Sequence, residues 1–345
     1  MPTAVVRRTL RPLAPLLGLT LAFAAAALPG CGDGGSEGRT RLKIASPLPE
    51  DHPATRALAE FAEDLTARTD GRVRATLFAN AALGNATEAL ESVRAGSNVE
   101  IAAVAASEIS QYDPMFNVLA MPFLFEDMDH MHRVLDGEVG AEFARRLRDQ
   151  GLHLLAYFDA GTRNIMTMTG PVQRPEDLSG RTIRVMTAKV LIDTINSLGA
   201  SAKPMPQGDV YTALRLGNID GWENNASTAF QFRMHETGCD HFAWTHHLAI
   251  PDLIVMNAAL YDRLPEDLRA ELDAAAAEML ARQRRLWAEA EAAAVASLQR
   301  EGVKFNEVDL AAFRERAAPV YERQIRQHGE LFESLVERIR REAAR

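Results

Sequence analysis

The chain has 345 residues, a formal net charge of -9, 47% hydrophobic residues and 25% charged residues. Its length exceeds one ordinary core and predicts two domains, and its ordinary composition excludes an intrinsically disordered chain or a membrane-embedded body. No long basic tract occurs, so the acidic balance also argues against nucleic acid as a partner, because phosphate binding requires a concentrated positive surface.

The first thirty residues predict an export signal. Arg7 and Arg8 precede an apolar run from Leu13 to Leu28, and no acidic residue occurs before Asp33. A charged start followed by a hydrophobic segment is typical of a secretory signal. A membrane anchor helix is the alternative, but the run is short and prolines interrupt it. We therefore predict that residues 1–30 are a signal peptide and that the mature protein is periplasmic.

The segment after the signal predicts a tether with a possible lipid anchor. Leu28-Pro29-Gly30-Cys31 resembles a lipobox, which predicts lipidation of Cys31 and membrane contact only through that lipid, although cleavage at upstream alanines is an alternative. Residues 31–40 are Gly-rich and predict a flexible tether. Their G-x-S-x-G pattern at Gly34–Gly38 has meaning only between a strand and a helix, so we reject a hydrolase site there. Cys239 is the one other cysteine, which excludes a disulfide framework.

Strands and helices alternate in the first part of the folded chain. This alternation predicts a parallel sheet with helices on its faces, and ligands bind beyond the carboxyl ends of the strands in such sheets. The turn Pro47–Pro53 and the segment Ala105–Tyr112 should therefore lie beside any ligand. The predicted strands are Leu42–Ala45, Val73–Phe78 and Ile101–Ala106, and the predicted helices are Ala54–Thr69 and Thr87–Arg94.

Later elements extend this pattern. An Ala- and Glu-rich helix from Pro265 to Glu301 is too polar to span a membrane and lacks coiled-coil heptads, so it predicts a helix that bridges two domains. The other predicted elements are a helix Met128–Gln150 and the strands Leu152–Phe158, Ile165–Met168, Arg181–Met186, Leu253–Asn257 and Val303–Phe305, with terminal helices at the end.

The segment Pro175–Asn225 predicts a site for a small anion. It places Arg184 on a strand, a helix start at Asp209, and a tight turn with the side-chain amides of Asn224 and Asn225 within one compact unit. A guanidinium suits a carboxylate because its planar fork donates two parallel, charge-assisted hydrogen bonds. The alternative is that Arg184 only pairs with an acidic neighbour such as Asp209.

An ordered series of motifs connects the chain to a known family. It resembles the solute-binding subunits of tripartite ATP-independent periplasmic (TRAP) transporters, the DctP family, from about Leu42 to the C-terminus. The matching motifs are Gly161-Thr162-Arg163, Pro175-Glu176-Asp177-Leu178, Ile183-Arg184-Val185, Leu198-Gly199-Ala200, Pro204-Met205-Pro206, Asp209-Val210-Tyr211, and Gly217-x-x-Asp220-Gly221-x-Glu223-Asn224.

The resemblance implies an α/β fold with two lobes, of the type II periplasmic-binding-protein kind. Each lobe would hold a mixed sheet flanked by helices, and the long helix would span both. Lobe 1 would comprise residues 41–160 and 250–289, and lobe 2 residues 161–249 and 290–345 with the C-terminal helices. The chain would cross between lobes near Ala160 and Ile250.

The resemblance also implies a function. The protein would be a monomer without catalytic activity, cofactor or metal that closes on an organic acid, such as a uronate, an aldonate or a C4-dicarboxylate. It would deliver this acid to small and large membrane subunits driven by an ion gradient. Two alternatives are an exported enzyme acting on a carboxylate and a ligand-sensing lobe for a signalling partner.

The family pattern assigns roles to three residues of this chain. Arg184 would form the main salt bridge to the ligand carboxylate, Arg163 would be the second basic contact, and Asn224 would contribute its amide. From the residues alone, Arg163 could instead form a surface salt bridge between lobes, and Asn224 could simply cap its turn.

Departures from the pattern bear on specificity. Asp209 replaces the usual Glu, and Ala105 and Gln207 stand where sialic-acid binders contact their ligand, which argues against sialic acid. Gln207 and Asn225, with Asn224, suit a hydroxylated ligand, because every buried hydroxyl needs a partner. Trp222 could stack on a sugar ring or belong to the core.

Histidines occur at two further places where a ligand or a metal could bind. His52, in the first predicted ligand-side turn, could touch the ligand or be a loop histidine with a local partner. Cys239, Asp240 and three histidines crowd together, at positions His241, His246 and His247, but their spacing matches no zinc pattern, so we predict no metal site.

Overall fold

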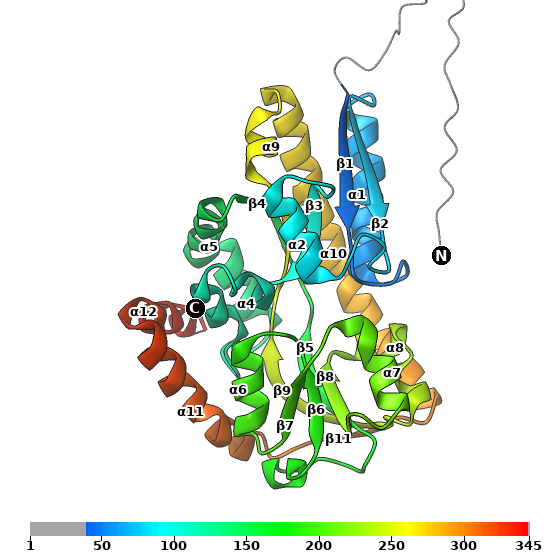
Figure 1. The fold of residues 1–345 in the computed structure, drawn as a ribbon, viewed down its shortest axis with the longest axis vertical. Coiled ribbons are helices and arrows are strands. Elements are labelled where there is room, and N and C mark those ends of the chain that lie inside the picture. Colours follow the sequence, from blue (N-terminus) through cyan, green and yellow to red (C-terminus); the bar gives the residue numbers. More distant parts are fainter. Residues whose placement is uncertain (1–38, 344–345) are drawn as a thin grey trace, which may run out of the picture. The chain divides into compact units, whose positions relative to one another are not determined.

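Two mixed β-sheets flanked by helices make up the described part of the chain, residues 39–343 of the computed structural model (Figure 1). The predicted α/β fold class with two mixed sheets is confirmed. The predicted signal peptide, the Cys31 lipidation site and the Gly34–Gly38 motif lie outside the described residues.

The first sheet has the strand order β2-β1-β3-β10-β4. β1 pairs in parallel with β2 and β3, as the alternation of strands and helices predicts, whereas β10 runs antiparallel to both β3 and β4. The bounds of these strands are β1 Thr40–Ala45, β2 Val73–Phe78, β3 Ile101–Ala105, β4 Leu152–Phe158 and β10 Asp252–Asn257.

Local sequence features determine where the helices that cover this sheet begin and end. His52 caps the start of α1 by accepting a hydrogen bond from the backbone N–H of Ala54, and Pro53 occupies the first helical turn, where its missing N–H costs nothing. The single helix predicted from Met128 to Gln150 is wrong, because extended backbone at Gly137 divides it into α4 and α5. The bounds are α1 Pro53–Arg68, α2 Ala86–Ala95, α3 Ala106–Ile109, η1 Pro114–Ala120, α4 Met128–Asp136, α5 Glu138–Asp149 and α9 Ala258–Arg263.

The second sheet has the order β11-β9-β5-β8-β6-β7, with β5 antiparallel to β8 and β9 and with β6 parallel to β7 and β8. Its strands are β5 Thr162–Thr167, β6 Thr182–Val185, β7 Ser201–Pro204, β8 Gly221–Asn224, β9 His241–Ala249 and β11 Lys304–Asn306. The helical segments inserted between them are η2 Pro175–Leu178, α6 Lys189–Ser197, η3 Gln207–Asp209, α7 Val210–Arg215, α8 Ala226–Gln231 and η4 Met234–Thr237.

Three helices end the chain. α10 (Glu266–Arg300) is 35 residues long and agrees with the predicted helix; it contacts α1 beside the first sheet and α8 beside the second (Figure 1). Leu272 and Met279 of α10 pack in the core of the first sheet, whereas Ala294 and Leu298 pack in a core of the second. α11 (Leu310–His328) and α12 (Glu330–Glu342) follow.

Within the described residues the chain passes between the sheets three times, from β4 to β5, from β9 to β10, and from β10 through α10 to β11. Gly161 stands at the first crossing with φ +60°, and a Cβ there would lie 3.0 Å from Cζ2 of Trp287 on α10. A left-handed backbone pressed against an indole ring requires glycine. Gly161 therefore lets the connection run close to the long helix.

Candidate functional site

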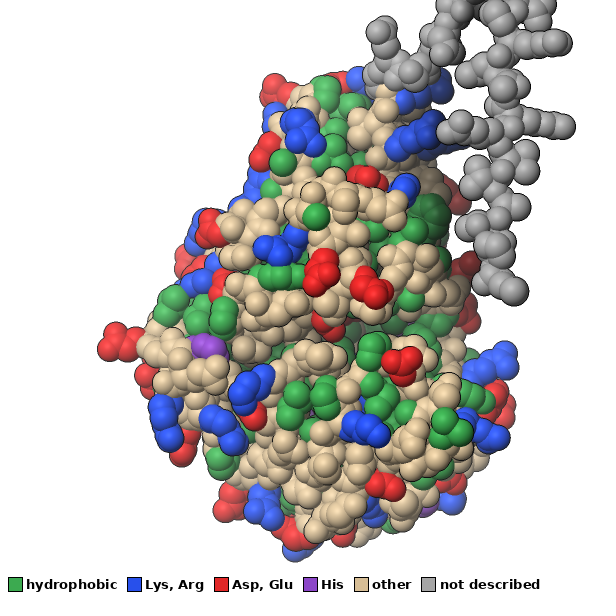
Figure 2. Space-filling view, in the orientation of Figure 1, with side chains coloured by type: hydrophobic (Ala, Val, Ile, Leu, Met, Phe, Trp, Pro, Cys, Tyr) green, Lys and Arg blue, Asp and Glu red, His purple; other side chains and the backbone are tan. Residues whose placement is uncertain are grey.

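A cavity of about 390 Å³ lies where the ends of the two sheets meet, within the usual range for small-molecule sites. Figure 2 shows a hollow between the upper and lower parts of the visible face, with acidic side chains close to it. Seven of the predicted site residues line the cavity, namely His52, Arg163, Arg184, Gln207, Asp209, Asn224 and Asn225. Residues of the two predicted ligand-side segments, including Pro47 and Ala105, line it as well.

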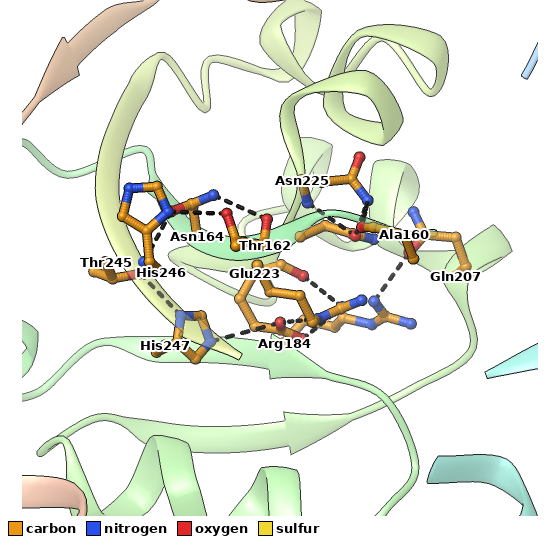
Figure 3. A network of polar contacts seen from close by, with 12 residues as sticks. Ala160, Thr162, Asn164, Arg184, Gln207, Glu223, Asn225, Thr245, His246 and His247 are labelled. Atoms are coloured by element: carbon orange, nitrogen blue, oxygen red, sulfur yellow. Dashed lines mark hydrogen bonds and ion pairs between the residues drawn. The ribbon is translucent and has the colours of Figure 1, made fainter. Parts of the chain in front are cut away.

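Arg184 is a buried cation whose direct partners are uncharged. It lies on β6 with 1% of its surface exposed. Its Nε and Nη2 donate to the carbonyl of Met205 at 2.9 and 2.7 Å. Its Nη1 donates to Oε1 of Gln207 at 3.0 Å (Figure 3). Burial lowers the pKa of Arg184 to about 10, although the charge of Glu223 opposes this shift, so the guanidinium remains protonated at neutral pH.

The alternative partner for Arg184 is not seen. Asp209 is exposed, and across residues 39–343 no carboxylate lies within 4.0 Å of the Arg184 guanidinium. A buried charge without a counter-ion is costly, so the folded chain holds here a positive site that an anion would complete.

Arg163, unlike Arg184, has a carboxylate partner within the protein. It lies on β5, and its Nε and Nη2 donate to both carboxylate oxygens of Glu223 on β8, with the Nη2 to Oε1 distance 2.9 Å. Nη2 also donates to the Glu223 carbonyl at 2.9 Å. Glu223 is fully buried, and Nε2 of His247 lies 3.7 Å from its Oε2 (Figure 3). The charge of Arg163 is thus balanced within the protein, whereas that of Arg184 is not.

Glu223 should make the fold sensitive to acid. Burial opposes its ionisation, but Arg163 and His247 overcome this and lower its pKa from 4.5 to about 2. A depressed carboxyl pKa contributes stability that is present above about 4.5 and is lost as pH falls toward 2. We expect urea denaturation at pH 3 and pH 7 to show a smaller pH dependence of the unfolding free energy for Glu223→Gln than for the wild type. Parallel pH profiles of the two proteins would contradict this role of Glu223.

Two adjacent asparagines have separate roles. Oδ1 of Asn225 caps α8 by accepting from the N–H of Thr228 at 2.6 Å, and its Nδ2 donates to the carbonyl of Ala160 at 2.9 Å. Oδ1 of Asn224 accepts from the Asn225 N–H at 2.9 Å, while its Nδ2 makes no hydrogen bond within residues 39–343. Asn225 therefore holds the turn, and Asn224 keeps an amide donor available at the cavity.

His52 connects the two sides of the cavity. Its Nδ1 caps α1, so Nε2 carries the proton and lies 3.4 Å from Oγ1 of Thr228 on α8. The ring centroid lies 5.7 Å from that of Trp287. Burial lowers the pKa of His52 to about 3, so the ring is neutral.

The stacking role considered for Trp222 is corrected by its position. Trp222 is fully buried and packs in the apolar core that α7 and α8 cover, among Val210, Leu214 and Ala229, and it does not line the cavity. A large ring in the middle of a sheet gains most from such burial. The aromatic side chains at the cavity are Phe232 and Trp287, which sequence reasoning missed.

No metal-binding cluster is found among the residues that the structure describes. Cys239 is buried, and burial raises the pKa of its thiol. His241, by contrast, lies near Asp240, and His247 belongs to the Glu223 network.

Comparisons with known proteins decide the family. Residues 44–328 match the family described as bacterial extracellular solute-binding protein, family 7 (DctP). The chain belongs to the DctP family. A solute-binding protein of Chromohalobacter salexigens is 35% identical over 289 residues, which cover 84% of this chain and 85% of that protein.

Solved structures agree. A TRAP periplasmic solute-binding protein from Sulfitobacter sp. NAS-14.1 with bound β-D-galacturonate has a TM-score of 0.85 and 30% identity, covering 88% of this chain and 100% of that chain. Another from Chromohalobacter salexigens DSM 3043 with bound D-glucuronate has a TM-score of 0.85 and 33% identity, covering 87% and 99% of the two chains. The predicted resemblance to TRAP solute-binding proteins is confirmed.

The DctP chain is therefore an extracytoplasmic solute-binding protein that works with the membrane subunits of a TRAP transporter, and it is not an enzyme. Within residues 39–343 no helix is long and apolar enough to cross a bilayer.

Sequence reasoning also missed two acidic residues of the cavity. Glu108 and Asp252 both line it. A signal was present for each, because Glu108 lies in the segment Ala105–Tyr112, which was expected beside the ligand, and Asp252 follows the predicted crossing near Ile250.

Proposed function

We propose that the ligand of this DctP protein is a sugar acid of the uronate class, held by its carboxylate on Arg184. The observation that carries the proposal is the buried Arg184 guanidinium, whose direct partners are a carbonyl and an amide oxygen. A ligand carboxylate would supply the missing negative charge. The two structural relatives with bound uronates support the same class of ligand.

Amide groups around Arg184 suit the rest of such a ligand. Gln207 accepts from Arg184 through Oε1, while its buried Nε2 has no partner in the described chain, and Nδ2 of Asn224 is also free. We assign these two donors to ligand oxygens, since an unmet buried donor is costly. Arg163 is assigned the second basic contact through Nη1, because its Nε and Nη2 are used by Glu223. His52 and Asp209 would lie at the edge of the bound ligand.

The ligand would be enclosed by closure of two lobes, residues 41–160 with 250–289 and residues 161–249 with 290–345. Hinge closure around a ligand requires a few flexible backbone positions, and Gly161 stands at the crossing from β4 to β5. The contact of His52 with Thr228 joins α1 to α8 across the cavity and would help to hold the closed form.

Export and delivery complete the proposal. Residues 1–30 would direct the chain to the periplasm, and Cys31 would carry a lipid that keeps the protein at the membrane. The closed protein, as a monomer, would then present its acid to the permease of the TRAP transporter.

A thermal-shift screen tests the ligand class. We expect D-glucuronate and D-galacturonate to raise the melting temperature more than aldonates, C4-dicarboxylates, 2-oxo acids or sialic acid. A ligand present at a hundred times its dissociation constant adds about 2.7 kcal/mol to the free energy of unfolding. A melting temperature unchanged by either uronate but raised by a C4-dicarboxylate would overturn the proposed ligand class.

A further inference from the structure

We propose that Glu108 and Asp252 restrict the ligand to acids whose second end is uncharged and hydroxylated, and that they exclude dicarboxylates. This inference rests on the proposed binding of a carboxylate at Arg184. It identifies specificity-determining residues at one end of the first sheet, on β10 and on the adjoining helix α3, opposite the arginines of the second sheet.

The charges of the cavity are distributed unevenly. Among the described residues that line it, the cationic side chains are Arg163 on β5 and Arg184 on β6, both of the second sheet. The side of the first sheet contributes two carboxylates, Glu108 and Asp252, and no lysine or arginine; a third lining carboxylate, the exposed Asp209, lies on the side of the second sheet. Both cations thus lie on one side of a bound molecule, and two of the three carboxylates lie on the other.

Strand pairing brings the two carboxylates to the same end of the first sheet. Asp252 is the first residue of β10 and is paired with Ala105, the last residue of β3. Glu108 follows Ala105 by three residues, on the short helix α3 that continues from β3. Residues that are distant in the sequence thus form one acidic edge of the cavity.

Both carboxylates keep acceptor capacity for a ligand. One oxygen of Glu108 accepts from Oγ1 of Thr87 at 2.9 Å. In the described part of the chain, the Asp252 side chain makes neither a hydrogen bond nor an ion pair. Ionised carboxylates are acceptors only, so the groups that satisfy them are donors such as ligand hydroxyls.

The electrostatic state of the pair agrees with this role. Burial raises the pKa of Glu108, with Thr87 and Arg184 opposing, and burial raises the pKa of Asp252 to about 6, with Arg163 opposing and Glu108 adding to the rise. Asp252 is thus ionised at neutral pH, but burial makes its anionic form less stable than it would be in water. A further negative charge at this edge would add like-charge repulsion in a partly desolvated site.

A matched set of ligands tests the inference. D-glucuronate, D-gluconate and D-glucarate all have six carbons; glucuronate carries its one carboxylate at C6 and gluconate at C1, whereas glucarate carries a carboxylate at both ends. We expect calorimetry at pH 7.5 with the purified protein to show glucarate binding at least about 100-fold weaker than the tighter of the two monocarboxylates, because facing like charges reject wrong partners strongly. Equal affinity for glucarate would overturn the inference.

Isosteric variants assign the discrimination to these residues. Asp252→Asn and Glu108→Gln should each raise the ratio of glucarate affinity to monocarboxylate affinity by about tenfold or more, mainly because glucarate binds more tightly. Asp149→Asn, an exposed change at the end of α5 outside the cavity, is the matched control and should leave the ratio unchanged. Circular dichroism checks that each variant is folded. If the affinity ratio is unchanged in the folded variants Asp252→Asn and Glu108→Gln, other residues exclude dicarboxylates, and the proposed role of this pair is refuted.

The same panel separates failure of the inference from failure of the proposed function. Adding two shorter pairs, lactate with malate and butanoate with succinate, extends the comparison beyond sugar acids. Binding of a short monocarboxylate but of no sugar acid would overturn the proposed ligand class and support the exclusion of dicarboxylates. Preference for malate, succinate or glucarate would overturn the exclusion, and absence of binding by every acid would count against both.

Discussion

Arg184→Ala is expected to abolish detectable binding of the sugar acid and to leave the fold intact. Removing one partner of a desolvated, hydrogen-bonded charge pair costs roughly 2–5 kcal/mol, which weakens binding by tens- to thousands-fold. The fold should tolerate the change because the structure gives Arg184 no counter-ion to leave behind, only the carbonyl of Met205 and the side chain of Gln207. Calorimetry with D-glucuronate measures the affinity, and urea denaturation measures the stability.

Two variants sharpen this experiment. Arg181→Ala removes a nearby arginine that donates to the carbonyl of Gly170 and does not line the cavity, so affinity should stay unchanged. Arg184→Lys keeps the charge but loses the planar fork, and it should recover only part of the affinity. Unchanged affinity in Arg184→Ala would refute the carboxylate site, and full recovery by Arg184→Lys would refute bidentate binding.

Arg163→Ala is expected to act mainly on the stability of the fold and less on ligand recognition. The substitution leaves Glu223 buried with its main charge partner removed, and breaking a buried ion pair from one side costs about 3–5 kcal/mol. The free energy of unfolding should therefore fall far more in Arg163→Ala than in Arg184→Ala. Urea denaturation of both variants measures this difference, and the dependence of the unfolding free energy on urea concentration should be compared between them.

A double variant tests the mechanism of that loss. If the unpaired charge of Glu223 causes it, Arg163→Ala/Glu223→Gln should be more stable than Arg163→Ala alone, since the second change removes the stranded charge. A loss below about 1 kcal/mol in Arg163→Ala, typical of surface ion pairs, would contradict the structural role. Additive effects of the two changes would show that the ion pair is not their common cause.

The two arginines differ in that Arg163 has a counter-ion within the protein and Arg184 does not, and the sequence could not predict this difference. Both were assigned to the ligand from the family pattern, and both line the cavity. The partner of Arg163 is Glu223, 60 residues away, and only the antiparallel pairing of β5 with β8 brings them together. Sequence spacing contains no such information, because the register of distant strands depends on the whole sheet.

The sequence alone determined the fold class and the family, and it predicted the strand that carries Arg184. Apolar periodicity, proline, glycine and capping residues act over a few positions, so the turn before α1, the strand with Arg184 and the amide turn at Asn224 were all predicted. The long helix α10 followed from composition in the same way.

Tertiary structure decided which side chains face one another. It buried Trp222 in a core, placed Trp287 of α10 at the cavity, and brought Glu108 and Asp252 to one edge of the first sheet. These outcomes depend on the packing of helices on sheets and on the pairing of strands far apart in the chain, which no local pattern encodes. The charge of each residue was visible in the sequence, but its counter-charge was set by the fold.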